Sequence, residues 1–112
     1  MALEVNGKSI ERDDNGNLVD YTEWNEDVAK ALAAEDGIEL TEKHFDLLNF
    51  LRTAYIDDNG DQPMERAINK GMSDFWGTKV TSKELYDLFP GAPSKQGNRI
   101  AGLPYIARKG GY

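Results

Sequence analysis

LTEKHFDLLNFLRTAY, residues 40–55, is the stretch that decides the fold. Within it, apolar side chains recur every three or four residues, which is the spacing of one face of an α-helix. Thr41 precedes the periodic stretch and can cap the helix, and residues 57–60 (DDNG) are of the types that end one. The pattern predicts a helix from Thr41 to about Tyr55, with a wide apolar face at the centre of the core. That face contains Phe45, Leu47, Leu48, Phe50, Leu51 and Tyr55.

The N-terminal segment has the pattern of a β-hairpin. Residues 3–10 alternate between apolar and polar around Asn6-Gly7, and both of these residues accept the positive φ of a type I′ turn. A second Asn-Gly pair, at 15–16, precedes the apolar residues 18–19. We therefore expect a small sheet of two or three strands.

Four further helices are expected from the same periodicity and from start and stop signals. Their ranges are 25–36, ended by Gly37; 63–75, begun by Pro63; 82–89, capped by Thr81 or Ser82; and 95–101, capped by Ser94. The larger aromatic residues are expected in the core, namely Trp24, Phe45, Phe50, Phe75, Trp76 and Phe89. The predicted fold class is α+β and mostly helical, with the N-terminal β-hairpin followed by about five helices. We expect one domain over residues 1–104.

The composition excludes several classes of site. There is no cysteine, so the chain forms no disulfide, thiolate metal site or persulfide, and His44 is the only histidine. His44 could carry a proton if Glu23 or Asp46 lay beside it, but a structural role is favoured because no nucleophile supports catalysis. Residues 13–17 and 57–61 are rich in Asp and Asn, yet their spacing indicates turns rather than calcium loops. We predict no metal, no cofactor and no enzymatic activity.

No apolar run approaches the roughly 18 residues of a membrane span, and nothing resembles a secretion signal. A cytoplasmic protein without membrane contact is therefore expected. The net charge is −7, but residues 91–112 carry +4 with no acidic residue, which leaves −11 on residues 1–90. Such an acidic body disfavours broad binding to nucleic acid, whose phosphates attract basic surfaces. Residues 63–89 could still form a helix-turn-helix-like element, so DNA remains a less favoured partner.

The last residues, SKQGNRIAGLPYIARKGGY at 94–112, combine cationic and aromatic side chains of the kinds that dominate protein interfaces. Glycine at 110 and 111 leaves this end mobile unless a partner orders it. We predict a flexible C-terminal arm over residues 105–112. The candidate partner-binding residues are Lys95, Arg99, Tyr105, Arg108, Lys109 and Tyr112.

Three stretches together resemble the DsrC/TusE/DsvC sulfur-relay family, whose members include the gamma subunit of dissimilatory sulfite reductase. They are residues 40–52, residues 85–96 (LYDLFPGAPSKQ) and residues 100–104 (IAGLP). Val5-Asn6-Gly7-Lys8 and Trp24 fit the same pattern, so the similarity spans nearly the whole chain. The resemblance implies a small helical domain with an N-terminal hairpin, a helix-turn-helix-like element and a mobile C-terminal arm.

The resemblance also implies two cysteine positions, and neither holds sulfur in this chain. The family's arm carries a penultimate cysteine that accepts sulfur, and some members have another shortly after Lys-Gln. Here Asn98 stands at the upstream position and Gly111 is penultimate, while Lys109 falls at the family's cysteine if no gap is allowed. Only a thiolate can form the persulfide that the relay requires.

Three functions follow from these observations. The leading hypothesis is a non-catalytic, cysteine-less DsrC-like protein that binds or regulates sulfur-relay or sulfite reductase partners. The second is the ordinary sulfur carrier, acting in sulfite reduction or in tRNA 2-thiolation, with its cysteines removed from the expressed chain. The third is a DNA-binding regulator that uses the helix-turn-helix-like element.

Overall fold

The protein was analysed as a computed structural model, which describes residues 2–105 of the 112. The described chain contains a two-stranded antiparallel hairpin, β1 (Ala2–Val5) and β2 (Lys8–Glu11), followed by a 3₁₀ turn at Tyr21–Glu23 and five helices. The helices are α1 (Glu26–Glu35), α2 (Glu42–Asp57), α3 (Glu65–Trp76), α4 (Ser82–Leu88) and α5 (Gln96–Ile100). This order confirms the predicted fold class.

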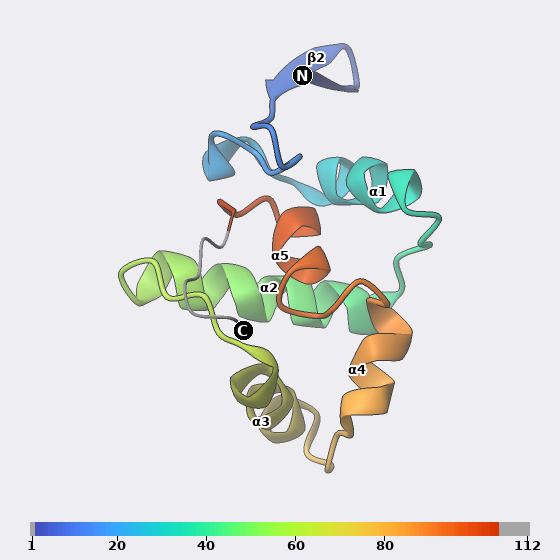
Figure 1. The fold of residues 1–112 in the computed structure, drawn as a ribbon, viewed down its shortest axis with the longest axis vertical. Helices are drawn as coiled ribbons and strands as arrows, with labels where there is room; N and C mark the ends of the chain where they lie inside the picture. The colour runs from blue at the N-terminus through green and yellow to red at the C-terminus, as the bar shows by residue number, and fades with distance from the viewer. Residues whose placement is uncertain (1, 106–112) are drawn as a thin grey trace.

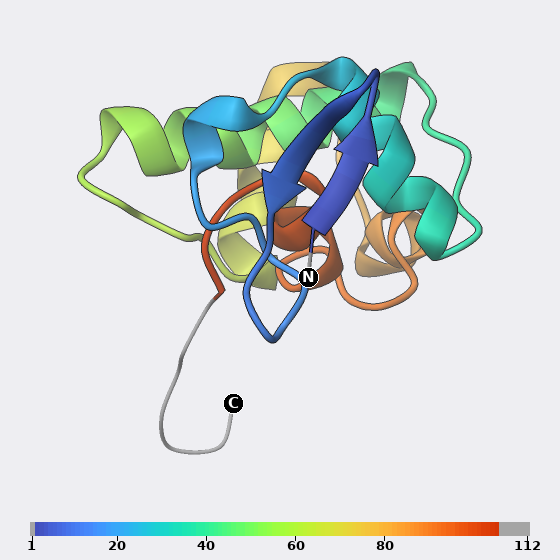
Figure 2. The same cartoon turned by 90° about the horizontal axis from the view of Figure 1, so that it is seen from above.

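The hairpin forms as its sequence predicts. Leu3 pairs with Ile10 and both are buried, while Asn6 and Gly7 have φ of 52° and 80° and close the turn. Arg12 and Leu18 add one isolated antiparallel bridge beyond the strands, so the sheet stays two-stranded. Seen from above in Figure 2, the hairpin lies across the layer of α1 and the 3₁₀ turn.

Helix α2 is the central element, with the other helices arranged around it (Figure 1). Leu47, Leu48 and Leu51 on its inner face are at most 1% exposed. Helix α5 packs between α1 and α2, and α3 packs on α2 and α4. The helix runs two residues beyond the predicted Tyr55, to Asp57. The remaining fully buried large side chains come from every other part of the fold, including Ile10, Leu32, Ile68, Met72, Leu85, Phe89, Ile100 and Leu103.

Three sequence expectations about individual residues are wrong. Pro63 was expected to begin the third helix, but α3 starts at Glu65 with Met64 as its N-cap. Phe75 was expected in the core but is 67% exposed, because the inward stripe of α3 runs through Ile68, Met72 and Trp76 and leaves Phe75 on the solvent side. Ser94 was expected to cap α5, but the residue before the helix is Lys95, which makes no side-chain capping bond. The backbone N–H of Ser94 instead donates to Glu65 Oε1 at 2.8 Å.

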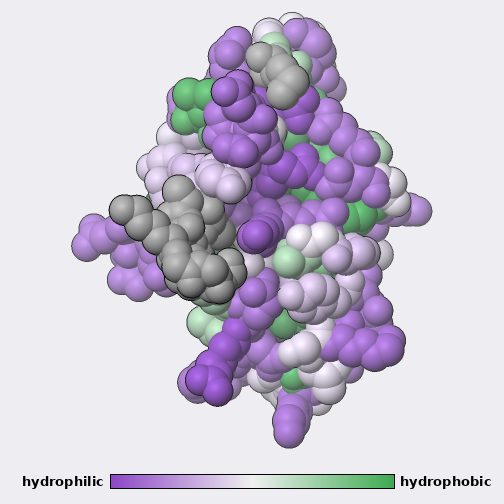
Figure 3. Space-filling view, in the orientation of Figure 1, coloured by the Kyte–Doolittle hydropathy of each residue, from purple (hydrophilic) through white to green (hydrophobic). Residues whose placement is uncertain are grey.

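The described surface is mostly hydrophilic, with apolar residues in separate small patches on the face drawn in Figure 3. Within residues 2–105, no helix combines the length and the apolar character that crossing a bilayer requires.

Candidate functional site

Helix α5 is short, and its glycine lets it pack close to α2. A Cβ on Gly97 would lie 3.2 Å from Leu51 Cδ1, a distance tighter than ordinary van der Waals contact. Gly97, Asn98 and Ile100 are buried, although two of the three carry no large apolar side chain. The close contact places the polar side chain of Asn98 deep in the protein, where its exposed fraction is 1%.

The chain after α5 is fixed by side chains from distant parts of the sequence. Trp24 Nε1 donates to Ile100 O at 2.8 Å, and Arg52 Nη1 donates to Ala101 O at 2.9 Å. Arg52 also stacks over the Trp24 ring, with its guanidinium carbon 4.4 Å from the ring centroid. Gly102 then turns with φ of 74°, and a Cβ there would lie only 2.5 Å from Trp24 Cδ1. The course of the chain through residues 100–102 is therefore tightly determined.

Three side-chain amides bind the next two carbonyls, which we call the arm root (Leu103 O and Pro104 O). Asn17 Nδ2 donates to Leu103 O at 2.9 Å. Asn98 Nδ2 and Gln62 Nε2 both donate to Pro104 O, at 2.8 and 2.9 Å. The donors come from the loop after β2, the loop between α2 and α3, and α5. They hold the point from which the predicted arm begins.

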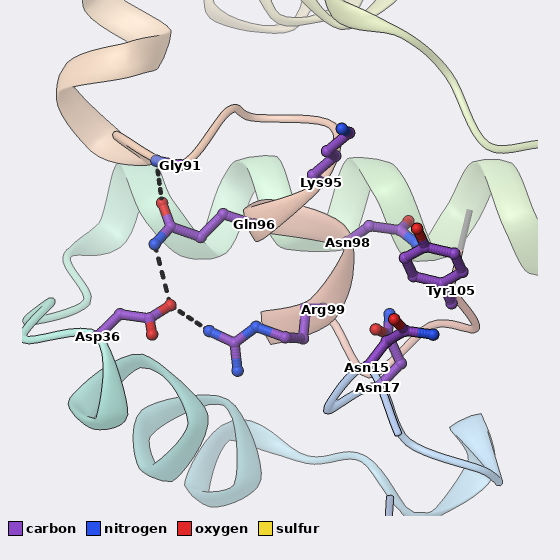
Figure 4. Close-up of a pocket in the computed structure, with 9 residues that line it drawn as sticks. All are labelled: Asn15, Asn17, Asp36, Gly91, Lys95, Gln96, Asn98, Arg99 and Tyr105. Atoms are coloured by element: carbon purple, nitrogen blue, oxygen red, sulfur yellow. Dashed lines mark hydrogen bonds and ion pairs between the residues drawn. The ribbon is translucent and has the colours of Figure 1, made fainter. Parts of the chain in front are cut away.

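A pocket of about 310 Å³, which we call the α5 pocket, opens beside the arm root and is lined mainly by polar residues (Figure 4). Gln96 links two of its walls, because its Oε1 accepts from Gly91 N at 2.7 Å and its Nε2 donates to Asp36 Oδ2 at 2.9 Å. Arg99 forms an ion pair with the same Asp36 oxygen. The full lining is Asn15, Asn17, Asp36, Gly91, Lys95, Gln96, Asn98, Arg99 and Tyr105.

Four residues selected from the sequence line this one pocket: Lys95, Asn98, Arg99 and Tyr105. The other four selected residues, Arg108, Lys109, Gly111 and Tyr112, lie outside the described residues, as does most of the predicted arm.

Sequence reasoning missed the residues that form the rest of the pocket. Asn15 and Asn17 were interpreted only as part of a turn, and Asp36 only as the end of a helix. The acidic charge of Asp36 was the one available signal for a partner of Arg99. Nothing in the one-dimensional pattern placed Asn17 beside Leu103, because that contact spans 86 positions.

His44 occupies a structural position, as favoured from the sequence. Its Nδ1 accepts from the Thr41 backbone N–H at 3.0 Å, and its Nε2 donates to Leu88 O at 2.9 Å, so the proton of the neutral ring resides on Nε2. Burial lowers the pKa of His44, and the hydrogen bond to Leu88 partly opposes this. The carboxylate of Asp46 bonds to Trp76 Nε1 instead, at 2.9 Å. Among residues 2–105, no cluster of three or more acidic or histidine side chains could hold a metal ion.

Two lysines of the helix-turn-helix-like pair α3 and α4 are paired with acids. Lys70 lies 3.6 Å from Asp74, and Lys83 lies 3.1 Å from Asp87, each within its own helix. These acids offset the cations that a phosphate backbone would need. The geometry gives no support to the DNA-binding hypothesis.

Comparison with known proteins places these features in a family. The family model described as "DsrC like protein" matches residues 4–107. Sulfurtransferase TusE of Pectobacterium atrosepticum is 43% identical over 103 residues, covering 91% of this chain and 94% of that protein. The TusE homolog of Haemophilus influenzae is 39% identical over 107 residues, covering 95% of this chain and 97% of that protein.

Solved structures agree with this result. The oxidized gamma subunit of dissimilatory sulfite reductase (DsrC) from Archaeoglobus fulgidus superposes with a TM-score of 0.88 at 36% identity, covering 97% of this chain and 99% of that one. DsrC of Allochromatium vinosum gives the same TM-score at 39% identity, with the same coverage. The likeness extends over both the central α2 and the segment that carries the α5 pocket. On this evidence, the chain belongs to the DsrC-like family of sulfur-relay proteins.

Proposed function

We propose that this protein acts in sulfur metabolism by binding protein partners and carries no sulfur itself. The observation that supports the proposal most is the chemistry of Asn98. The resemblance places a cysteine at this position, and here a buried carboxamide binds the arm root instead. An amide holds a hydrogen bond but cannot accept a sulfur atom as a persulfide.

The whole chain supports the same conclusion, because it contains no cysteine in its 112 residues. A sulfur carrier needs a thiolate at each transfer step. Without one, the protein can compete with a true carrier for a docking site, or regulate the partner it binds, but it cannot pass sulfur on. We accordingly propose that it is not an enzyme.

The proposed binding element is the arm of residues 105–112, beyond a domain that ends at Pro104. Arg108 and Lys109 give it positive charge and Tyr105 and Tyr112 give it aromatic surface, in contrast to the acidic body. The arm root, with three amide donors from distant segments, fixes where such an arm would leave the domain. The names of the relatives suggest a sulfite reductase or a sulfur-relay protein as candidate partners, and we propose that they meet this protein in the cytoplasm.

The proposal is tested by capture from native lysate with two forms of the purified protein. The full chain is compared with a chain that ends at Pro104, and retained proteins and nucleic acids are identified by mass spectrometry and sequencing. We expect the full chain alone to retain a sulfite reductase or a relay protein. Retention of DNA by both forms, or of nothing by either, would contradict the proposal.

A second measurement addresses sulfur transfer directly. The full chain is incubated with a persulfide-loaded sulfurtransferase carrying labelled sulfur, and covalent label is measured after gel separation without reductant. We expect no label above that of a cysteine-free control protein. Label on this chain would refute a purely binding role, whatever partner the capture experiment had found.

A further inference from the structure

We propose that the α5 pocket binds a small organic acid that also carries an N–H or O–H group. Its acidic group would lie at Lys95, and its hydrogen-bond donor would reach Asn98 Oδ1. The site needs no protein partner and uses only the first residue of the arm, Tyr105, so this inference stands apart from the proposed function.

The first observation is an unsatisfied acceptor. Asn98 is 1% exposed, and its Nδ2 is bound to Pro104 O, but its Oδ1 is buried and has no hydrogen-bond partner within residues 2–105. Buried carbonyl oxygens are nearly always bonded, and leaving one without a donor is unfavourable. In Figure 4 the side chain projects from α5 toward Tyr105, another residue of the pocket lining. The oxygen therefore favours a ligand with a donor group.

A ligand would have to pass Tyr105 to reach this oxygen. The oxygen itself is buried, and Tyr105 lines the same pocket as Asn98 (Figure 4). Tyr105 is 51% exposed, and exposed side chains change rotamer within nanoseconds. The proposal requires that rotation of this side chain lets a donor approach Asn98, and the ring would then also offer an aromatic face to the ligand.

The charged residues that line the α5 pocket favour an acidic ligand over a basic one. Lys95 is exposed and forms no ion pair within residues 2–105. Arg99 is already partnered by Asp36 and by Glu35, whose Oε1 lies 3.7 Å from it. Lys95 is thus the cation left available for a ligand anion, and the lining residues together carry one excess positive charge. An ammonium ligand would be repelled by the same groups.

The size and lining of the pocket restrict the ligand further. A volume of about 310 Å³ lies at the lower end of known ligand sites. Asn15, Asn17 and Gln96 contribute carboxamides to its lining, and such groups can bind the polar groups of a metabolite. Phosphorylated sugars, hydroxy acids and nucleoside monophosphates all carry both an acidic group and an N–H or O–H donor.

The test uses the full chain and its side-chain amide signals in ¹H–¹⁵N NMR spectra. Ribose 5-phosphate, glycerate and uridine 5′-monophosphate are added separately at about 5 mM, which largely fills a site with a dissociation constant of about 1 mM. Inorganic phosphate supplies the anion alone, and uridine supplies donors without the anion. We expect at least one of the three acids to shift the Asn98 and Gln96 side-chain signals in a saturable way, and neither control to do so.

Two exposed lysines provide matched variants. Lys95→Ala should weaken binding about fivefold, whereas Lys30→Ala, on the exposed face of α1, should leave it unchanged. Asn98→Asp adds a negative charge at the acceptor and should abolish binding; its spectrum away from the pocket verifies that it folds. The proposal fails if none of the three acids moves the Asn98 signals, which would indicate that only water satisfies Oδ1. It also fails if inorganic phosphate binds equally well, or if both lysine variants weaken binding alike.

Discussion

His44 and Asn98 are both buried polar residues, but they occupy different kinds of environment. His44 has both ring nitrogens bonded and stacks edge-on against Phe89, with ring centroids 5.1 Å apart. Asn98 has one bonded atom and one buried oxygen that finds no partner among the described residues, in the wall of a pocket. The first residue joins α2 to the end of α4 and is fully accounted for by structure. The second is accounted for only in part, which makes its region the better candidate for function.

The largest loss of stability is expected from a substitution in the backbone segment that follows α5 and supports the Asn98 region. Gly102→Ala should lower the free energy of unfolding by about 4 kcal/mol, because the new methyl group meets Trp24 at 2.5 Å and φ is 74°. Gly7→Ala is the matched control, with φ of 80° but no atom within 4 Å, and should cost about 1 kcal/mol. Urea denaturation measures both. Equal losses would mean that Trp24 yields easily and that the chain after α5 is not tightly held.

The comparison itself is tested by truncating each polar side chain. His44→Ala should cost about 3 kcal/mol, because Thr41 N and Leu88 O both lose their partner and Phe89 loses its contact. Asn98→Ala should cost about 1 kcal/mol, since Gln62 still donates to Pro104 O and the unsatisfied oxygen disappears. A larger loss at Asn98 than at His44, measured by the same denaturation, would reverse the comparison.

The same contrast shows how far the sequence could predict this protein. The period of residues 40–55 and the Asn6-Gly7 turn predicted α2 and the hairpin, because local periodicity and turn chemistry determine such elements. The prediction that Phe75 lies in the core was wrong, because an apolar residue at the edge of the apolar face of a helix becomes buried only if another element covers it. Four residues of the α5 pocket had been selected from the sequence, because of the family resemblance or because they belong to the basic C-terminal segment. Asn17 and Asp36 could not be found, because their contacts depend on tertiary packing.

The burial of His44 also predicts that the stability of the protein depends on pH. Burial lowers the pKa of His44 in the folded state, so the unfolded chain binds a proton more readily. Stability should therefore be constant above the ordinary pKa of about 6.5 and should fall as the pH drops from there toward the lowered folded-state pKa. Because His44 is the only histidine, urea midpoints between pH 7.5 and 5.5 report mainly on it. His44→Gln should remove most of this dependence; if the slope persists in that variant, another group causes it.

The smallest expected effect lies on the surface, away from both buried residues. Lys83 and Asp87 form an ion pair at 3.1 Å, with side chains that are 83% and 64% exposed. Exposed pairs contribute little, because water screens them and ordering two long side chains costs entropy. Lys83→Ala should therefore change the free energy of unfolding by less than about 0.5 kcal/mol, as measured by urea denaturation at low and high salt. A clear, salt-sensitive loss would show that charge on α4 matters beyond this pair, and the stability contrast between His44 and Asn98 would then have to be measured again at high salt.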